Sequence, residues 1–228
     1  MCGRFVLWIN LSLADHYDLA DSDISIPASY NIAPGQDIMA VVRQSTGRKL
    51  VRFQWGLIPS WTKDVTRSPK SINARSETVW EKPSFRSAIR SRRSLIPANG
   101  FLDWKKYGAR KQPFLVRCEN LELFSMAGIW ESWKNQETGE TIDSCAILTT
   151  NANEVVATIH DRMPVIIKPQ DYAVWLTPET NREQIDALLH PFTDTPTLMQ
   201  PVSTRVNSPK NNDPECIVPV LLPDKAQG

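Results

Sequence analysis

Cys2 follows the first methionine directly, and it is the residue most able to do covalent chemistry in this sequence. Bacterial-type methionine removal acts when the second side chain is small, so we expect the mature chain to begin with this cysteine. Its α-amine and thiol have ordinary pKa values of about 7.7 to 8.0 and about 8.5, which predicts that both are reactive at neutral pH. An amine adds to an aldehyde to give a Schiff base, and a neighbouring thiol then closes a five-membered thiazolidine. The position therefore predicts covalent bonding to an aldehyde.

The two residues after Cys2 favour this interpretation over that of an incidental small residue. Gly3 permits close approach of backbone, and Arg4 places a fixed cation beside the amine. Without these neighbours, position alone favours the incidental residue.

The charge of the chain is nearly balanced, with 26 basic and 25 acidic residues, but it is unevenly distributed. Between Arg43 and Lys111 there are 17 basic and four acidic residues. This segment also holds clustered arginines interleaved with tryptophans, namely Arg86, Arg90, Arg92, Arg93, Trp55, Trp61, Trp80 and Trp104. Cations with exposed aromatic planes are typical of proteins that bind unpaired bases, although a solvated surface is the alternative and we assign Trp55 to the core.

Several classes of protein are disfavoured by the rest of the sequence. The four cysteines lie far apart without a CxxC pair, which predicts neither a disulfide framework nor a zinc site. We expect no metal and no cofactor. No apolar run approaches the roughly 18 to 20 residues of a membrane span, and no signal peptide is apparent, so we expect a cytoplasmic protein.

The elements that must position these residues are mostly short strands, because 17 prolines interrupt the apolar runs. We expect an anchored strand over residues 2–9, a helix over 12–20 capped by Ser12, and a hairpin formed by 37–44 and 48–57. A basic helix is expected over 83–90. Further strands are predicted over 94–98, 100–105, 113–117, 121–129, 145–149 and 197–203, and helices over 151–158, 171–176 and 182–189. We expect one domain over residues 1–222 and a flexible tail over 223–228.

Seven ordered motifs together resemble the abasic-site processing family, also called SOS-response-associated peptidases. They are Met1–Phe5, Tyr30–Pro34, Trp55–Trp61, Ile72–Thr78, Ile96–Phe101, His160–Pro164 and Pro201–Ser203. The resemblance implies an α+β fold: a β-rich single domain whose bifurcated sheet forms a pseudo-barrel with short flanking helices. It also implies a monomer that binds abasic sites in single-stranded DNA, joins the nucleoid when DNA is damaged, and shields the lesion through a thiazolidine crosslink at Cys2.

The same resemblance assigns roles to individual residues. Asn73 lies against the opened sugar, and His160 is the general acid and base. Asp103 handles protons at the α-amine, although the family usually has the longer glutamate there. Arg4, Arg75 and Arg162 bind phosphates, while Pro34 and Trp61 wedge against and stack on bases. The competing structural explanations are a turn cap at Asn73, core packing of Pro34 and Trp61, and a buried salt bridge at Arg162, for example with Asp161.

Two other functions fit parts of the pattern. In an N-terminal-nucleophile peptidase, Cys2 would first help to release Met1, and the mature cysteine would then cleave an amide in another substrate. Cys2, His160 and Asp103 would serve as nucleophile, base and orienting carboxylate. A non-catalytic single-strand binder would need only the basic segment. The cationic, tryptophan-bearing segment disfavours the first, and the second leaves Asn73, Asp103 and His160 without a role.

Overall fold

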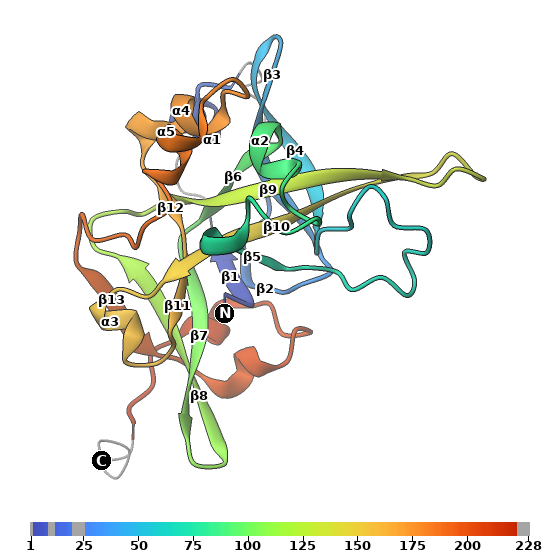
Figure 1. Cartoon of the computed structure of the whole chain (residues 1–228). Coiled ribbons are helices and arrows are strands. Elements are labelled where there is room, and N and C mark those ends of the chain that lie inside the picture. Colours follow the sequence, from blue (N-terminus) through green and yellow to red (C-terminus); the bar gives the residue numbers. More distant parts are fainter. Residues whose placement is uncertain (1, 9–11, 20–25, 223–228) are drawn as a thin grey trace.

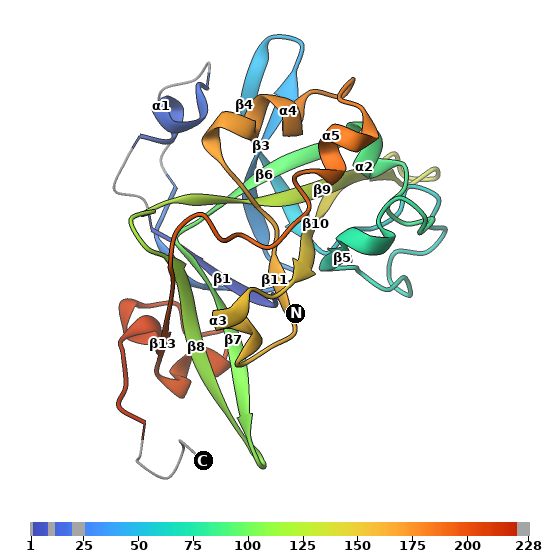
Figure 2. The same ribbon diagram turned by 60° about the vertical axis from the view of Figure 1, so that its left-hand side comes forward.

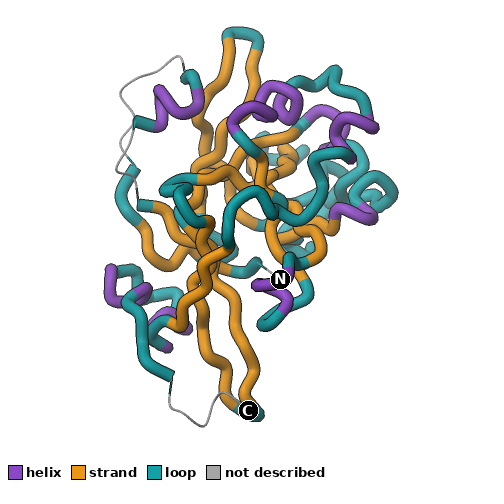
Figure 3. The backbone as a smooth tube through the Cα atoms, turned by 90° about the vertical axis from the view of Figure 1, so that its left-hand side faces the viewer, coloured by secondary structure: helices purple, strands orange, loops and turns teal. Residues whose placement is uncertain are grey.

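The computed structural model of the chain describes residues 2–8, 12–19 and 26–222, and strands dominate it (Figures 1 and 3). The predicted tail over 223–228 lies outside the described residues. Two sheets pack around one main hydrophobic core, which draws residues from both of them. This arrangement confirms the predicted α+β, β-rich pseudo-barrel with short helices.

The first sheet has the strand order β13-β8-β7-β1-β2. Its strands are β1 (Arg4–Leu7), β2 (Ser29–Ile32), β7 (Gly100–Tyr107), β8 (Arg110–Cys118) and β13 (Thr197–Pro201). Because β1 pairs with β2 on one side and β7 on the other, the start of the chain is held inside a sheet. Arg4 is opposite Leu102, so the next step of the antiparallel register brings Asp103 level with Gly3.

The second sheet has the order β11-β10-β4-β3-β6-β9-β12, with β5 beside β10. Its strands are β3 (Asp37–Gln44), β4 (Gly47–Trp55), β5 (Asn73–Arg75), β6 (Arg93–Ala98), β9 (Phe124–Lys134), β10 (Thr141–Asn151), β11 (Arg162–Pro164) and β12 (Ile166–Ile167). Strand β10 pairs Ile147 with Asn73 and Asn151 with Arg162. Two motifs that lie far apart in the sequence thus meet on one strand.

The helices are short and lie at the periphery of the sheets (Figure 2). They are α1 (Leu13–Tyr17), α2 (Ala88–Ser91), α3 (Glu154–Ala157), α4 (Tyr172–Leu176) and α5 (Arg182–Asp186), with 3₁₀ turns η1 (Ser76–Thr78), η2 (Pro169–Asp171), η3 (Thr204–Asn207) and η4 (Pro214–Ile217). Ser12 accepts a hydrogen bond from the Asp15 backbone N–H, which confirms the predicted cap. The predicted basic helix over 83–90 is wrong in extent, since only Ala88–Ser91 is helical and turns precede it.

The predicted hairpin is confirmed by β3 and β4, which pair from Asp37 with Gln54 to Gln44 with Gly47. Trp55, at the end of β4, is fully buried and donates from its indole N–H to the Ile72 carbonyl oxygen at 2.9 Å. Its assignment to the core is therefore confirmed. Strands β2 and β5 are too short to show a clear alternation in the sequence, which predicts no strand at either place.

Candidate active site

Cys2 is completely buried and lies two residues before β1 begins. Burial, followed by the nearby Asp103 carboxylate, raises the pKa of the Cys2 thiol to about 12. The physical reason is desolvation, which disfavours the thiolate and which the sequence does not reveal. This value holds for the chain that carries residue 1; the expected reactivity of the amine and thiol concerns the mature chain and stays a prediction.

Asn73 on β5 is directly connected to this cysteine. Its Nδ2 donates a hydrogen bond of 2.9 Å to the Cys2 carbonyl oxygen. Its Oδ1 is buried and has no hydrogen-bond partner among the described residues. Since a buried polar atom without a partner is costly, Oδ1 is suited to accept a hydrogen bond from a bound molecule.

Asp103 on β7 is buried beside Cys2, and its Oδ1 accepts from the Trp104 backbone N–H at 2.9 Å. Burial raises the pKa of the Asp103 carboxyl, and the hydrogen bond from the Trp104 backbone N–H and the nearby His160 ring partly oppose this. Both residues line a pocket of about 360 Å³, whose other lining residues are Trp104, Lys106, Lys111 and Asn207. The fold therefore brings Cys2, Asn73, Asp103 and His160 together from four separate segments.

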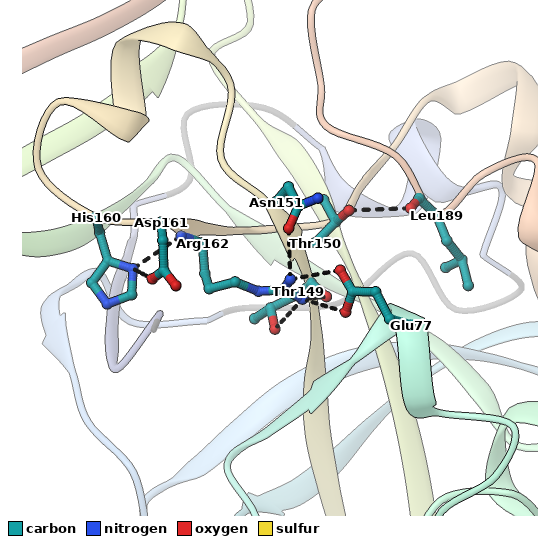
Figure 4. Close-up of polar contacts among 8 residues, drawn as sticks. All are labelled: Glu77, Thr149, Thr150, Asn151, His160, Asp161, Arg162 and Leu189. Atoms are coloured by element: carbon teal, nitrogen blue, oxygen red, sulfur yellow. Dashed lines mark hydrogen bonds and ion pairs between the residues drawn. The ribbon is translucent and has the colours of Figure 1, made fainter.

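His160 follows α3, and its Nδ1 has two neighbours that favour different protonation states (Figure 4). The Arg162 backbone N–H donates to Nδ1 at 3.0 Å, while the Asp161 Oδ1 lies 2.9 Å from the same atom. When Nδ1 accepts from Arg162, the neutral ring carries its proton on Nε2; when Nδ1 donates to Asp161, Nε2 can accept a proton. This arrangement lets His160 give or take a proton at Nε2.

Arg162 is part of a buried polar network rather than an open cation (Figure 4). Its guanidinium binds the Glu77 carboxylate in a bidentate manner, at 2.6 and 2.9 Å, and also donates to Asn151 Oδ1 at 3.0 Å. The residue is 6% exposed. The salt bridge considered with Asp161 is instead made with Glu77, a partner that sequence reasoning missed although it lies within the Ile72–Thr78 motif. A phosphate contact by Arg162 stays a prediction.

Three other predicted binding residues are exposed near the ends of their elements. Pro34 and Arg75 are exposed, and Trp61 exposes 64% of its surface, so core packing does not explain any of them. The Arg75 side chain has no hydrogen bond or ion pair within the described part of the chain. Their predicted contacts with a nucleic acid remain compatible with this exposure.

Arg4 is half-buried and held in place from two sides. It donates to Asn31 Oδ1 at 2.6 Å and to the Val206 carbonyl oxygen at 2.7 Å, and its guanidinium lies 5.9 Å from the centroid of the Trp104 ring. Burial lowers the pKa of Arg4. Asn31, from the Tyr30–Pro34 motif, is itself buried and donates to carbonyl groups of residues 206–211. That motif therefore has a structural function.

The clustered arginines do not form one cationic surface. Arg93 is buried and donates to four backbone carbonyl groups at the ends of α2 and α4. Arg92 is paired with Glu131 at 2.7 Å, while Arg86 and Arg90 are exposed. The expectation that Arg92 and Arg93 belong to a nucleic-acid surface is therefore wrong, because their guanidinium groups bind other parts of the protein.

Within the described residues, no cluster of three His, Cys, Asp or Glu side chains has the arrangement of a metal site. The same part of the chain contains no helix whose length and hydropathy would let it span a membrane.

Comparison with known proteins shows the family of the chain. The family model described as SOS response associated peptidase (SRAP) matches residues 1–209. This chain belongs to the SRAP family. The abasic site processing protein YoqW of Bacillus subtilis is 40% identical over 95% of this chain and 99% of its own. Abasic site processing protein HMCES of Xenopus tropicalis is 31% identical over 90% of this chain and 70% of its own.

Solved structures show the same SRAP architecture. A Bacteroides thetaiotaomicron protein superposes with a TM-score of 0.74 at 31% identity, covering 82% of each chain. A phage-related protein of Bordetella bronchiseptica superposes with a TM-score of 0.68 at 25% identity, covering 88% of this chain and 94% of its own.

Proposed function

We propose that this SRAP protein senses abasic sites in single-stranded DNA and bonds to them covalently through a mature N-terminal Cys2, forming a thiazolidine that shields the lesion. The observation that carries the proposal is the placement of Cys2 against Asn73 and beside the pocket of Asp103 and His160. The printed names of the relatives, abasic site processing proteins, support the same substrate.

In the first step, the α-amine attacks the aldehyde carbon of the ring-opened abasic sugar. The amine must be neutral to attack, and Asp103 is suited to accept its proton because burial makes this carboxylate more basic than usual. The carbinolamine then loses water, for which His160 Nε2 delivers a proton to the departing oxygen. Asn73 Oδ1 accepts from a sugar hydroxyl and fixes the orientation.

In the second step, the Cys2 sulfur adds to the carbon of the C=N bond. The Cys2 side chain is buried, which disfavours the thiolate, so we propose that the amine reacts before the sulfur does. On ring closure the thiol proton moves to the nitrogen, and the overall reaction releases one water. The exposed Arg75, Pro34 and Trp61, together with Arg4 and Arg162, are proposed to hold the strand.

The same buried thiol disfavours an N-terminal cysteine peptidase. Peptidases of that kind attack with a thiolate, whose formation requires a pKa near or below neutrality. In the chain that carries residue 1, a pKa of about 12 leaves only about one thiol in 10⁵ ionised at pH 7, which disfavours release of Met1 by this thiol.

The proposal is tested by mixing the protein with matched oligonucleotides, with and without one abasic site, and separating the products on a denaturing gel. We expect a heat-stable shifted band with the abasic oligonucleotide alone. A band of equal intensity with the intact oligonucleotide, or no band with either, would reject the proposal.

Asp103 provides a separate prediction that joins reactivity to stability. Asp103→Asn should slow crosslinking by about 10²-fold, as expected for loss of a general base, whereas Asp103→Glu should retain most of the rate. The folded state raises the pKa of the Asp103 carboxyl. The contribution of this group to the free energy of unfolding is therefore fully present below the ordinary carboxyl pKa, and it is lost as the pH rises through the folded-state pKa.

Asp103→Asn should therefore stabilise the protein more at pH 7 than at pH 4. Urea unfolding of wild type and variant at both values measures this difference. Crosslinking by Asp103→Asn at the wild-type rate would show that Asp103 does not move the proton.

A further inference from the structure

The β7–β8 hairpin carries positive charge that the proposed chemistry does not use. Figures 1 and 2 show it extending away from the body of the molecule. Residues 104–118 contain no Asp or Glu, and the outer part of the hairpin carries Lys105, Lys106, Arg110 and Lys111. None of these four forms a salt bridge with any described residue.

Two of these cations are direct cross-strand partners. Lys106 is opposite Lys111 in the antiparallel register, so both side chains lie on the same face of the hairpin. Like charges directly opposite each other destabilise a sheet unless something neutralises them. Both are exposed, and both line the pocket that also contains Asp103 and His160. An anion between them would relieve the repulsion.

Trp104, at the base of this face, is held by contacts with other parts of the protein. Trp104 lies on the same face as Lys106, two positions earlier on β7, and its indole N–H donates to Asn207 Oδ1 at 2.7 Å. The Arg4 guanidinium lies against the Trp104 ring. The two lysines therefore extend from a rigid platform that begins at the candidate active site.

We propose that Lys106 and Lys111 form a phosphate subsite that binds the DNA backbone next to the lesion. The proposal rests on the proposed function, because it takes the strand at Cys2 as the source of the phosphate. Ammonium groups bind phosphate as point charges and need no base-specific contact, which suits a lesion that occurs in any sequence. The hairpin thus acts as an arm that extends the DNA-binding surface beyond the reacting pocket.

The opposite face of the same hairpin supplies a matched control. Lys105 pairs with Gln112, and Arg110 pairs with Tyr107, so their side chains project from the other face. Lys105→Ala/Arg110→Ala removes the same charge from the same hairpin as Lys106→Ala/Lys111→Ala. The two double variants remove equal charge, but only Lys106 and Lys111 line the pocket, and Lys105 also lies 5.4 Å from the centroid of the Tyr107 ring.

The test uses an oligonucleotide that carries tetrahydrofuran in place of the abasic sugar, so that binding is measured without an aldehyde. For single strands, the slope of log K against log salt changes by about 0.7 per phosphate contact. We expect Lys106→Ala/Lys111→Ala to reduce the slope by about 0.7, for the one phosphate held between the two lysines, and the control to leave it unchanged. An unchanged slope, or an equal reduction in the control, would overturn the subsite.

Two further measurements keep the outcome interpretable. Removing a like-charge pair should leave the melting temperature unchanged or raise it, so weaker binding would not reflect unfolding. Crosslinking to a natural abasic site is scored in parallel with wild-type protein. If wild-type protein forms no crosslink, the proposed function is rejected. A smaller salt slope for Lys106→Ala/Lys111→Ala than for wild type would still support the subsite.

Discussion

A chain that retains Met1, or that carries an uncleaved N-terminal tag, is expected to form no covalent product with an abasic-site oligonucleotide. The proposed reaction begins with the free α-amine of Cys2, and an amide nitrogen at that position does not form a Schiff base. The buried thiol cannot substitute, since a pKa of about 12 leaves it protonated. We expect loss of more than about 10⁴-fold in crosslinking rate, beyond the effect of a single acid or base group.

The matched control is the same tagged chain after cleavage that leaves Cys2 as the first residue, which should recover the reaction. Cys2→Ala separates the two functional groups further, because it keeps an N-terminal amine but lacks the sulfur. It should give no heat-stable band by itself and should give one after borohydride reduction of the imine. Crosslinking by the uncleaved chain would refute the aminothiol mechanism.

Arg93→Met is expected to lower the free energy of unfolding by about 4 kcal/mol, the other large effect. Arg93 is 2% exposed and donates to the carbonyl groups of Ile89, Arg90, Trp175 and Thr177. Hydrogen bonds from a charged donor contribute roughly 1.5 to 3 kcal/mol each, and their loss leaves buried acceptors unsatisfied. The cost of burying the guanidinium, which lowers the pKa of Arg93 to about 10, offsets part of this sum.

The control is Arg86→Met, in the turn that precedes α2, where the side chain is exposed. This change should alter stability by less than about 0.5 kcal/mol. Urea unfolding curves followed by tryptophan fluorescence give both values. If Arg93→Met is as stable as wild type but binds DNA more weakly, the structural assignment of Arg93 is wrong and the residue belongs to the nucleic-acid surface.

Local features of the fold could be predicted from the sequence because they depend on neighbouring residues. Ser12 caps α1 through an N–H only three positions away, and the β3–β4 hairpin forms around a short turn. The β-rich class followed from alternating apolar runs broken by prolines. The family followed from ordered motifs and is confirmed by the match over residues 1–209.

The sequence also singled out Cys2, Asn73, Asp103 and His160 by motif, but their proximity depends on packing between distant strands. Strand β10 brings Asn73 and Arg162 together, and β7 places Asp103 beside the start of β1. The exposure of the charged side chains and the ionisation of the site residues depend on the tertiary structure. Desolvation depends on every group packed around an atom. For this reason three arginines have different surroundings: Arg93 is buried, Arg162 is bound to Glu77, and Arg75 is exposed. For the same reason the Cys2 thiol is protonated in the chain that carries residue 1.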